Sequence, residues 1–139
     1  MIILDTNVVS EPIKLKSDTT AQEWLDNQVA ETLYLTSTSL AELLVGIDVL
    51  PLGKRRATLS ATVAEVVEKL FGDRILPFDR SAATVYAKLH GRTRASERAL
   101  SFADGQIAAI AVVRGFAVAT RDTAPFEAAG VRVINPWAQ

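Results

Sequence analysis

Four carboxylates stand at positions from which they could act together on one substrate. They are Asp5, Glu42, Asp104 and Asp122. Asp5 directly follows the apolar run 1–4, and Asp122 comes shortly after another apolar run, 117–120. In open parallel α/β sheets, ligands bind outside the carboxyl ends of the strands, so acids at such positions are candidates for a functional site.

Each acid also has a purely structural explanation, because acids are common at helix N-termini. Asp5 could cap the helix that follows it, and Asp122 could cap the turn that begins at Thr123. Residues 39–42 match a capping box, and residues 101–104 match a weaker version of it. Capping accounts for each acid alone, but it does not explain why four acids are predicted at the same edge of one sheet.

Carboxylates gathered in one place repel one another, and one of them stays protonated unless a cation offsets the charge. The chain has no cysteine and one histidine, His90, which excludes thiolate zinc sites and leaves too few imidazoles for a histidine-rich metal centre. A set of oxygen ligands favours magnesium or manganese. Because such an ion activates water and orients a phosphate, the expected chemistry is metal-assisted hydrolysis of a phosphodiester.

Short apolar runs alternate with helical segments along the chain, and these runs are the elements that must position the acids. The predicted strands span residues 1–4, 32–36, 74–77, 117–120 and 131–134. Their alternation with helices predicts an α/β fold, in which a central parallel sheet is flanked by helices on both faces. We expect a single domain over residues 1–139, since 49% hydrophobic residues suffice for one sizeable core.

The helical segments show stripes of apolar residues that predict buried faces. One stripe consists of Leu40, Leu43, Leu44, Ile47 and Leu50. A longer helix is expected over residues 54–70, and residues 101–114 are apolar nearly all round, which predicts a helix buried on several sides. Asp104 lies in that last helix and must meet a partner, since burying an unpaired carboxylate is costly.

The charge balance restricts the possible partners. The net charge is -1 and no block of like charge is long, so the composition does not indicate a DNA-binding protein, although a nucleic-acid enzyme needs only a local basic rim. The residues that could bind RNA phosphates, or simply form solvated faces, are Lys54, Arg55, Arg56, Arg92, Arg94 and Arg98. No apolar run approaches the ~20 residues of a membrane span and no basic segment precedes the first strand, so we expect a cytoplasmic protein without a membrane partner.

Four ordered blocks of sequence carry a more specific signal. They are Leu4-Asp5-Thr6-Asn7, Ser39-Leu40-Ala41-Glu42-Leu43 with Gly46, Ala103-Asp104-Gly105-Gln106-Ile107-Ala108-Ala109, and Ala119-Thr120-Arg121-Asp122. In order and spacing they resemble the motifs of the PIN-domain ribonucleases, most closely the VapC-type toxins of bacterial toxin–antitoxin pairs, including the FitB-like subgroup. The ending of the chain, 124–126 and 134–137, is also similar to that subgroup.

The resemblance covers essentially the whole chain and carries implications for its function. It implies a Rossmann-like parallel sheet and a magnesium- or manganese-dependent endoribonuclease that is the toxin of a type II toxin–antitoxin pair. It also implies a homodimer, inhibited by a cognate small antitoxin that binds DNA. The substrate would be RNA.

The same resemblance assigns roles to particular residues. Asp5, Glu42, Asp104 and Asp122 would form the catalytic and metal-binding site. Asp5 and Asp104 are the first choices for direct metal ligands. The supporting groups that orient the acids through hydrogen bonds would be Thr6, Asn7 and Thr120. Arg121 adjoins the acids and is a weaker candidate for binding substrate, with pairing to one of the acids as the alternative.

Two other functions remain open from the sequence. One is a catalytically inactive PIN-like binding module that acts only through a partner protein, although a binding surface has no reason to keep repelling carboxylates. The other is phosphoryl transfer through an aspartyl intermediate at Asp5. That chemistry usually needs a second nearby acid and a lysine, but residue 7 is Asn and no lysine follows Leu89.

Overall fold

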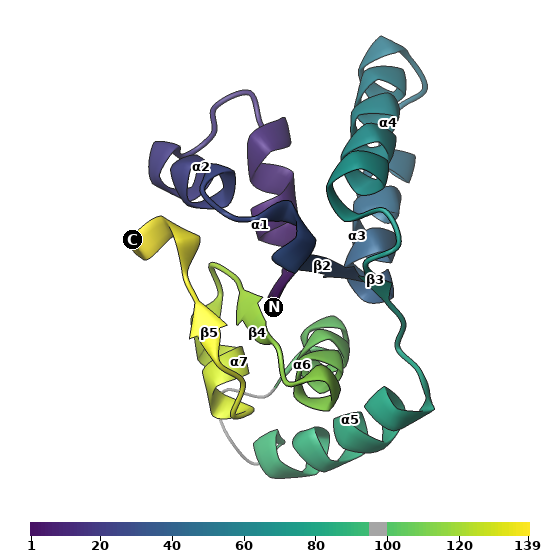
Figure 1. The fold of residues 1–139 in the computed structure, drawn as a ribbon. Coiled ribbons are helices and arrows are strands. Elements are labelled where there is room, and N and C mark those ends of the chain that lie inside the picture. The colour runs from purple at the N-terminus through teal and green to yellow at the C-terminus, as the bar shows by residue number, and fades with distance from the viewer. Residues whose placement is uncertain (95–99) are drawn as a thin grey trace.

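A computed structural model describes residues 1–94 and 100–139 and contains a five-stranded sheet in which each neighbouring pair of strands is parallel (Figure 1). The strands are β1 (Ile2–Leu4), β2 (Leu33–Thr36), β3 (Ile75–Leu76), β4 (Ala117–Ala119) and β5 (Val133–Ile134). Their order in the sheet is β3-β2-β1-β4-β5. The α/β fold with a central parallel sheet is therefore confirmed.

Helices cover both faces of the sheet, as Figure 1 shows. One face carries α1 (Thr6–Ser10), α2 (Thr19–Asp26), α3 (Ser37–Asp48) and α4 (Lys54–Val66), and the other carries α5 (Arg80–Thr93), α6 (Phe102–Arg114) and α7 (Thr123–Ala128). Short 3-10 turns lie at η1 (Glu11–Ile13), η2 (Ala30–Thr32) and η4 (Pro136–Ala138). Successive strand residues point to opposite faces, so Ile3 packs into the core under α5 to α7 and Leu4 into the core under α1 to α4.

The start of α3 differs from the sequence prediction. The last residue of β2, Thr36, has an extended backbone, and its hydroxyl accepts a hydrogen bond from the Ser39 N–H at 3.0 Å. The helix therefore begins at Ser37, and the capping box predicted over residues 39–42 is wrong. Because of this earlier start, Glu42 lies in the second turn of α3, where its carboxylate is not occupied by capping the helix.

The burial predicted for two helices is only partly right. Leu43 is buried, but Leu44 is 53% exposed, because α3 and α4 form a hairpin that extends beyond the sheet in Figure 1 and no described residue covers its outer face. In α6, residues 107–111 are buried as expected, whereas Phe102, Val112 and Val113 are exposed. The expected helix over 54–70 is α-helical to Val66 and continues as a π-helix, η3 (Val67–Phe71).

The strand order reverses direction at one place in the sheet. From β1 the sheet runs one way to β2 and β3 and the other way to β4 and β5. Such a reversal is a topological switch point, where the carboxyl ends of parallel strands leave room for a ligand. The acids that follow β1 and β4 therefore belong to the part of the sheet edge most suited to a site. Within the two described ranges, no helix has the length and apolarity needed to cross a membrane.

Candidate active site

Asp5 lies at the switch point and is held from two sides. The register pairs Leu4 with Ala119, so Asp5 stands beside Thr120 at the ends of β1 and β4. One carboxylate oxygen of Asp5 accepts the Thr6 N–H at 2.8 Å, and the other accepts the Thr120 hydroxyl at 2.8 Å. Only 5% of Asp5 is exposed. Asp5 thus caps α1, as its structural explanation proposes, and at the same time lies at the switch point of the sheet.

Thr120 connects the first and the last of the four motif segments. It is fully buried, and besides donating to Asp5 its hydroxyl oxygen accepts the Asn7 side-chain amide at 3.4 Å and the Asp122 N–H at 3.1 Å. The side-chain amide oxygen (Oδ1) of Asn7 in turn accepts the backbone N–H of Arg121 at 3.3 Å. This network ties the turn after β4 to the turn after β1, so the position of Asp122 depends on the same hydroxyl that orients Asp5.

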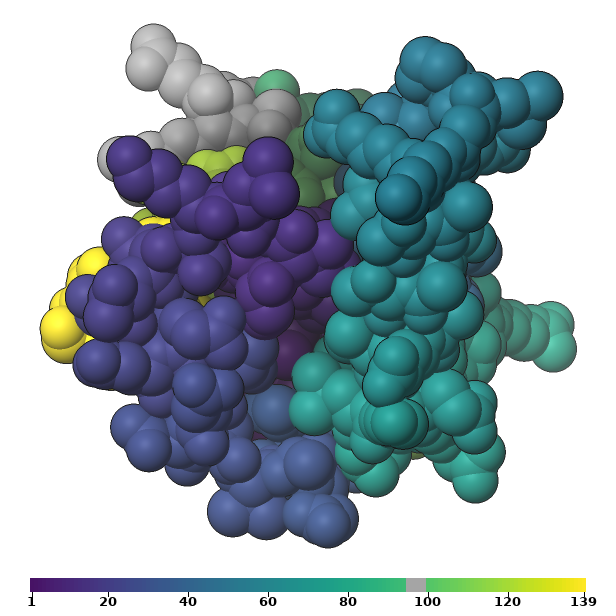
Figure 2. All heavy atoms as spheres, turned by 90° about the horizontal axis from the view of Figure 1, so that it is seen from above, coloured from purple at the N-terminus to yellow at the C-terminus, as the bar shows by residue number. Residues whose placement is uncertain are grey.

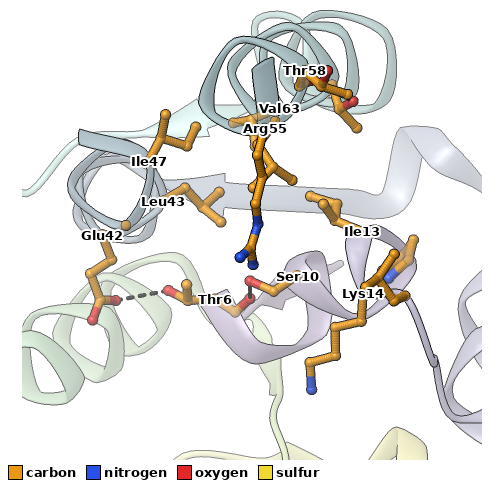
Figure 3. Close-up of a pocket in the computed structure, with 15 residues that line it drawn as sticks. Thr6, Ser10, Ile13, Lys14, Glu42, Leu43, Ile47, Arg55, Thr58 and Val63 are labelled. Atoms are coloured by element: carbon orange, nitrogen blue, oxygen red, sulfur yellow. Dashed lines mark hydrogen bonds between the residues drawn. The ribbon is translucent and has the colours of Figure 1, made fainter. Parts of the chain in front are cut away.

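Glu42 reaches the site from the neighbouring helix α3. Its side chain is exposed, and one carboxylate oxygen accepts a hydrogen bond from the Thr6 hydroxyl at 2.8 Å (Figure 3). Thr6 follows Asp5 directly in the chain. Its backbone N–H donates a hydrogen bond to Asp5, and its hydroxyl donates one to Glu42. One residue therefore bridges the acids of β1 and α3.

Asp104 lies in the first turn of α6 and is half-buried. The Asp104 N–H donates to the Ser101 hydroxyl at 3.1 Å, so Ser101 caps the helix as the sequence predicted. The next residue, Gly105, lets α5 approach closely, because a Cβ at position 105 would lie 2.5 Å from a ring carbon of Tyr86. Close packing of Tyr86 on Gly105 fixes the helical turn that carries Asp104.

Asp122 precedes α7, but its side chain makes no capping hydrogen bond and the residue is exposed. Capping, the structural alternative for Asp122, is therefore excluded. The backbone of Asp122 is nevertheless placed, through its bond to Thr120. An exposed carboxylate with a fixed backbone can turn toward a ligand at little cost.

The pKa values of Asp5 and Asp104 depend on burial and on the charges of the neighbouring acids. The pKa of Asp5 is raised to about 6, chiefly by burial; the hydrogen bonds from Thr120 and Thr6 oppose this rise, and the charges of Asp104 and Glu42 add to it. The pKa of Asp104 is also raised, first by burial and then by the charges of Asp122 and Glu42, while a hydrogen bond with Ser101 lowers it. The charges of neighbouring acids thus disfavour the ionised forms of Asp5 and Asp104.

The fit of a metal ion to this site can be judged from the donor atoms. In the described ranges, no three acidic or histidine side chains are gathered closely enough to hold an ion. The available donors are nonetheless all carboxylate oxygens, which suit a hard divalent cation. A cation would also favour ionised Asp5 and Asp104, whose charged forms burial and repulsion oppose. The donor chemistry fits such an ion, provided that the exposed side chains of Glu42 and Asp122 turn toward it.

The basic residues named from the sequence have different surroundings. The Arg121 guanidinium lies over the Trp137 ring, 5.2 Å from its centre, and is in none of the ion pairs found among the described residues. Arg56 pairs with Asp48, and Arg92 donates to the Ala129 carbonyl, so both have structural partners. Arg98 lies outside the described residues.

A groove adjoins the acids on the face covered by α1 and α4. It has a volume of about 800 Å³ and is bordered in Figure 2 by the purple N-terminal helices and the teal α4. Glu42, one of the four acids, and Thr6 form the end of the groove at the acidic site. Much of the remaining wall is apolar and includes Ile13, Ile47 and Val63. Its lining comes from segments far apart in the chain, so the spacing of residues in the sequence did not define it.

Comparison with known proteins establishes the family. A family model described as PIN domain matches residues 2–131. The chain belongs to the PIN-domain family, as the four sequence motifs indicated.

Individual relatives match over nearly the full chain. The plasmid stability protein StbB of Pseudomonas syringae pv. tomato is 47% identical, with 99% of both chains covered. A protein of Sinorhizobium fredii named VapC ribonuclease Y4jK is also 47% identical, with 99% of this chain and 98% of the relative covered. Toxin FitB of Neisseria gonorrhoeae is 41% identical, with 99% of both covered. The crystal structure of FitAcB from Neisseria gonorrhoeae has a TM-score of 0.94 and 40% identity, with 100% of both chains covered.

Proposed function

We propose that this chain is a magnesium- or manganese-dependent endoribonuclease and the toxin of a type II toxin–antitoxin pair. The observation that carries the proposal is the buried carboxylate of Asp5 at the switch point of the sheet, with the charges of Asp104 and Glu42 acting on it. A fold does not retain such mutually repelling acids for stability, which supports a role in binding a cation and an anionic substrate. The names of relatives, VapC ribonuclease and Toxin FitB, support the same function.

The residues would divide the work as follows. Asp5 and Asp104 would hold the metal ion directly, with Glu42 and Asp122 completing the set of oxygen donors. When bound, the ion would supply activation of water and orientation of the scissile phosphate. Thr120 and the Thr6 N–H keep the Asp5 oxygens oriented.

The chain would act with protein partners. The family resemblance implies a homodimer and a small DNA-binding antitoxin that inhibits it. The outer face of α3 offers a surface for such contacts, because Leu44, Val45 and Val49 are 53%, 60% and 74% exposed. Exposed apolar residues grouped on one helix face are characteristic of protein interaction sites.

The test is a cleavage assay on a randomised pool of single-stranded RNA, with the purified chain freed of any partner. We expect cleavage by the wild type with Mg²⁺ or Mn²⁺, no cleavage after chelation by EDTA, and a loss on the order of 10²–10³-fold in Asp104→Asn. Asp73→Asn is the matched control, because Asp73 is an exposed acid in a turn outside the site. It should cleave like the wild type.

Other outcomes would assign other functions. Equal activity in wild type and Asp104→Asn would contradict the proposal. A well-folded wild type that neither cleaves RNA nor responds to divalent cations would favour the inactive binding module. A phosphorylated Asp5, trapped with a phosphate donor, would favour phosphoryl transfer.

A further inference from the structure

Among the residues that the structure describes, one cation that lines the groove beside the acids has no partner. Two cationic residues line it, Lys14 and Arg55. The Lys14 ammonium lies 2.9 Å from a carboxylate oxygen of Glu11, so its charge is already compensated. Arg55 takes part in none of the ion pairs or side-chain hydrogen bonds found within residues 1–94 and 100–139. Its guanidinium is therefore available to a ligand.

The side chain of Arg55 is directed into the groove. Figure 3 shows it extending from the first turn of α4 across the groove toward Ser10 of α1. The Ser10 hydroxyl donates to the Thr6 carbonyl at 2.8 Å, so Ser10 is one turn along α1 from the residue that bridges Asp5 and Glu42. Arg55 is thus placed at the side of the path by which a substrate would reach the acids.

We propose that Arg55 binds a backbone phosphate of the RNA next to the phosphate that is cleaved; this inference rests on the proposed function. The acids that surround Asp5 repel the anionic backbone of RNA, so the approach of a strand needs a compensating charge nearby. A guanidinium provides it in a planar form that can bond to two phosphate oxygens at once. Single-stranded nucleic acids are commonly held in this way, by cations along a groove that follows the backbone.

Arg56 offers a matched control, because it follows Arg55 in the same helix turn but has a different environment. Its guanidinium bonds to Asp48 at 2.8 Å, and it faces a separate hollow between α3 and α4. Replacing either arginine removes the same formal charge from the same end of α4. Only the replacement of Arg55 removes a cation from the groove. Comparing the two variants therefore distinguishes a direct contact of Arg55 with RNA from a general effect of the net charge on RNA binding.

The experiment measures single-turnover cleavage of a randomised single-stranded RNA pool over a range of enzyme and salt concentrations. Arg55→Gln should raise the enzyme concentration for half-maximal cleavage about 5- to 10-fold and leave the saturated rate unchanged. The slope of log affinity against log salt concentration should become shallower by about 0.7, the effect of one lost phosphate contact on a single strand. Arg55→Lys should recover part of the affinity, and Arg56→Gln should differ from the wild type less than about twofold.

Several results would overturn the assignment. Equal half-maximal concentrations and equal salt slopes for Arg55→Gln and Arg56→Gln would do so, as would an unchanged affinity for RNA combined with weaker binding of a partner protein. If the wild type cleaves the pool, either of these results contradicts the role of Arg55 and leaves the proposed function standing. If the wild type cleaves no RNA, the proposed function fails and the role of Arg55 fails with it. Equal thermal midpoints for the variants and the wild type exclude unfolding as the cause.

Discussion

In the acidic site Asp5 is buried and Asp104 is half-buried, whereas Glu42 and Asp122 are exposed. The Asp5 carboxylate is held by a backbone N–H and a buried hydroxyl, and the pKa values of Asp5 and Asp104 are raised chiefly by burial. Glu42 accepts one bond from the Thr6 hydroxyl, and the Asp122 side chain caps nothing. The fold therefore positions the first two acids in advance and leaves the other two able to adjust to a ligand.

The strongest test of this difference is to remove the buried acid and one of the exposed acids. If the proposed function holds, Asp5→Asn should reduce RNA cleavage by on the order of 10²–10³-fold, because it would remove a preorganised ligand of the proposed metal ion. Asp122→Asn should cost about 10-fold, since its exposed amide can still contact a metal-bound water. Initial rates at saturating Mn²⁺ measure both. Equal losses of cleavage rate in the two variants would show that the buried and the exposed acids contribute equally to activity.

The second test compares the two threonines that orient the acids. Thr120→Val removes the hydroxyl that holds Asp5 and leaves the N–H groups of Asn7 and Asp122 without their acceptor, so we expect a loss of stability of about 1–3 kcal/mol and of activity of roughly 10- to 100-fold. Thr6→Val removes only the bond to Glu42 at an exposed position and should cost less than about 1 kcal/mol. Urea unfolding and cleavage rates measure the two effects.

Two measurements distinguish a role of Thr120 in orienting the Asp5 carboxylate from a role in packing alone. Thr120→Ser keeps the hydroxyl and should restore most of the activity. Because the Thr120 hydrogen bond lowers the pKa of Asp5, Thr120→Val should move the rise of activity with pH to a higher pH. An unchanged pH profile would assign Thr120 to packing alone.

The third test uses pH to measure the buried charge of Asp5. Its pKa is raised from 3.8 to about 6 on folding, so the native state retains a proton that the unfolded chain releases. The free energy of unfolding should therefore fall by roughly 2–3 kcal/mol as pH rises from about 4 to about 6.5, and stay level above that. Asp5→Asn should lack this term, because its side chain does not ionise.

The measurement compares the wild type with Asp5→Asn by urea unfolding in EDTA, so that the titrations of other groups largely cancel. The pKa of Glu11 is lowered by its bonds to Asp18 and Lys14, so its contribution to the free energy of unfolding rises with pH, opposite to that of Asp5. This contribution is the same in both proteins and cancels in the comparison. A difference between the two proteins that does not change with pH would contradict the raised pKa of Asp5.

The last test concerns the packing that fixes Asp104. Gly105→Ala places a methyl group against the Tyr86 ring and should destabilise the protein by about 1–3 kcal/mol while displacing the turn of α6 that carries Asp104. Gly91→Ala in α5 has open space around it and should stabilise by about 0.5–1 kcal/mol. Thermal unfolding gives both values, and a neutral Gly105→Ala would show that α5 can move away.

The sequence determined the alternation of strands and helices and the identity of the four acids. Runs of apolar residues such as Ile2–Leu4 are too short for helices and are followed by polar residues, so they predict strands locally. Asp18 and Asp79 cap α2 and α5 because a side chain at that position reaches N–H groups of its own first turn. These features depend on neighbours in the chain.

Local patterns failed where several residues could play the same role or where burial depends on distant elements. Thr36, Ser37 and Ser39 could each begin α3, and the conformation at the end of β2 selected Thr36. The spacing of Leu40, Leu43 and Leu44 identified a helix stripe but could not show that only part of it is covered.

Only the tertiary structure decided how the site is assembled. The order β3-β2-β1-β4-β5 places β1 beside β4 and so brings Thr120 to Asp5, although 115 residues separate them in the chain. The raised pKa of Asp5 and the groove that Arg55 enters likewise depend on which distant segments pack together. Residue types supply charge and hydrogen-bonding capacity, whereas burial and distance, which decide how strongly these act, exist only once the chain has folded.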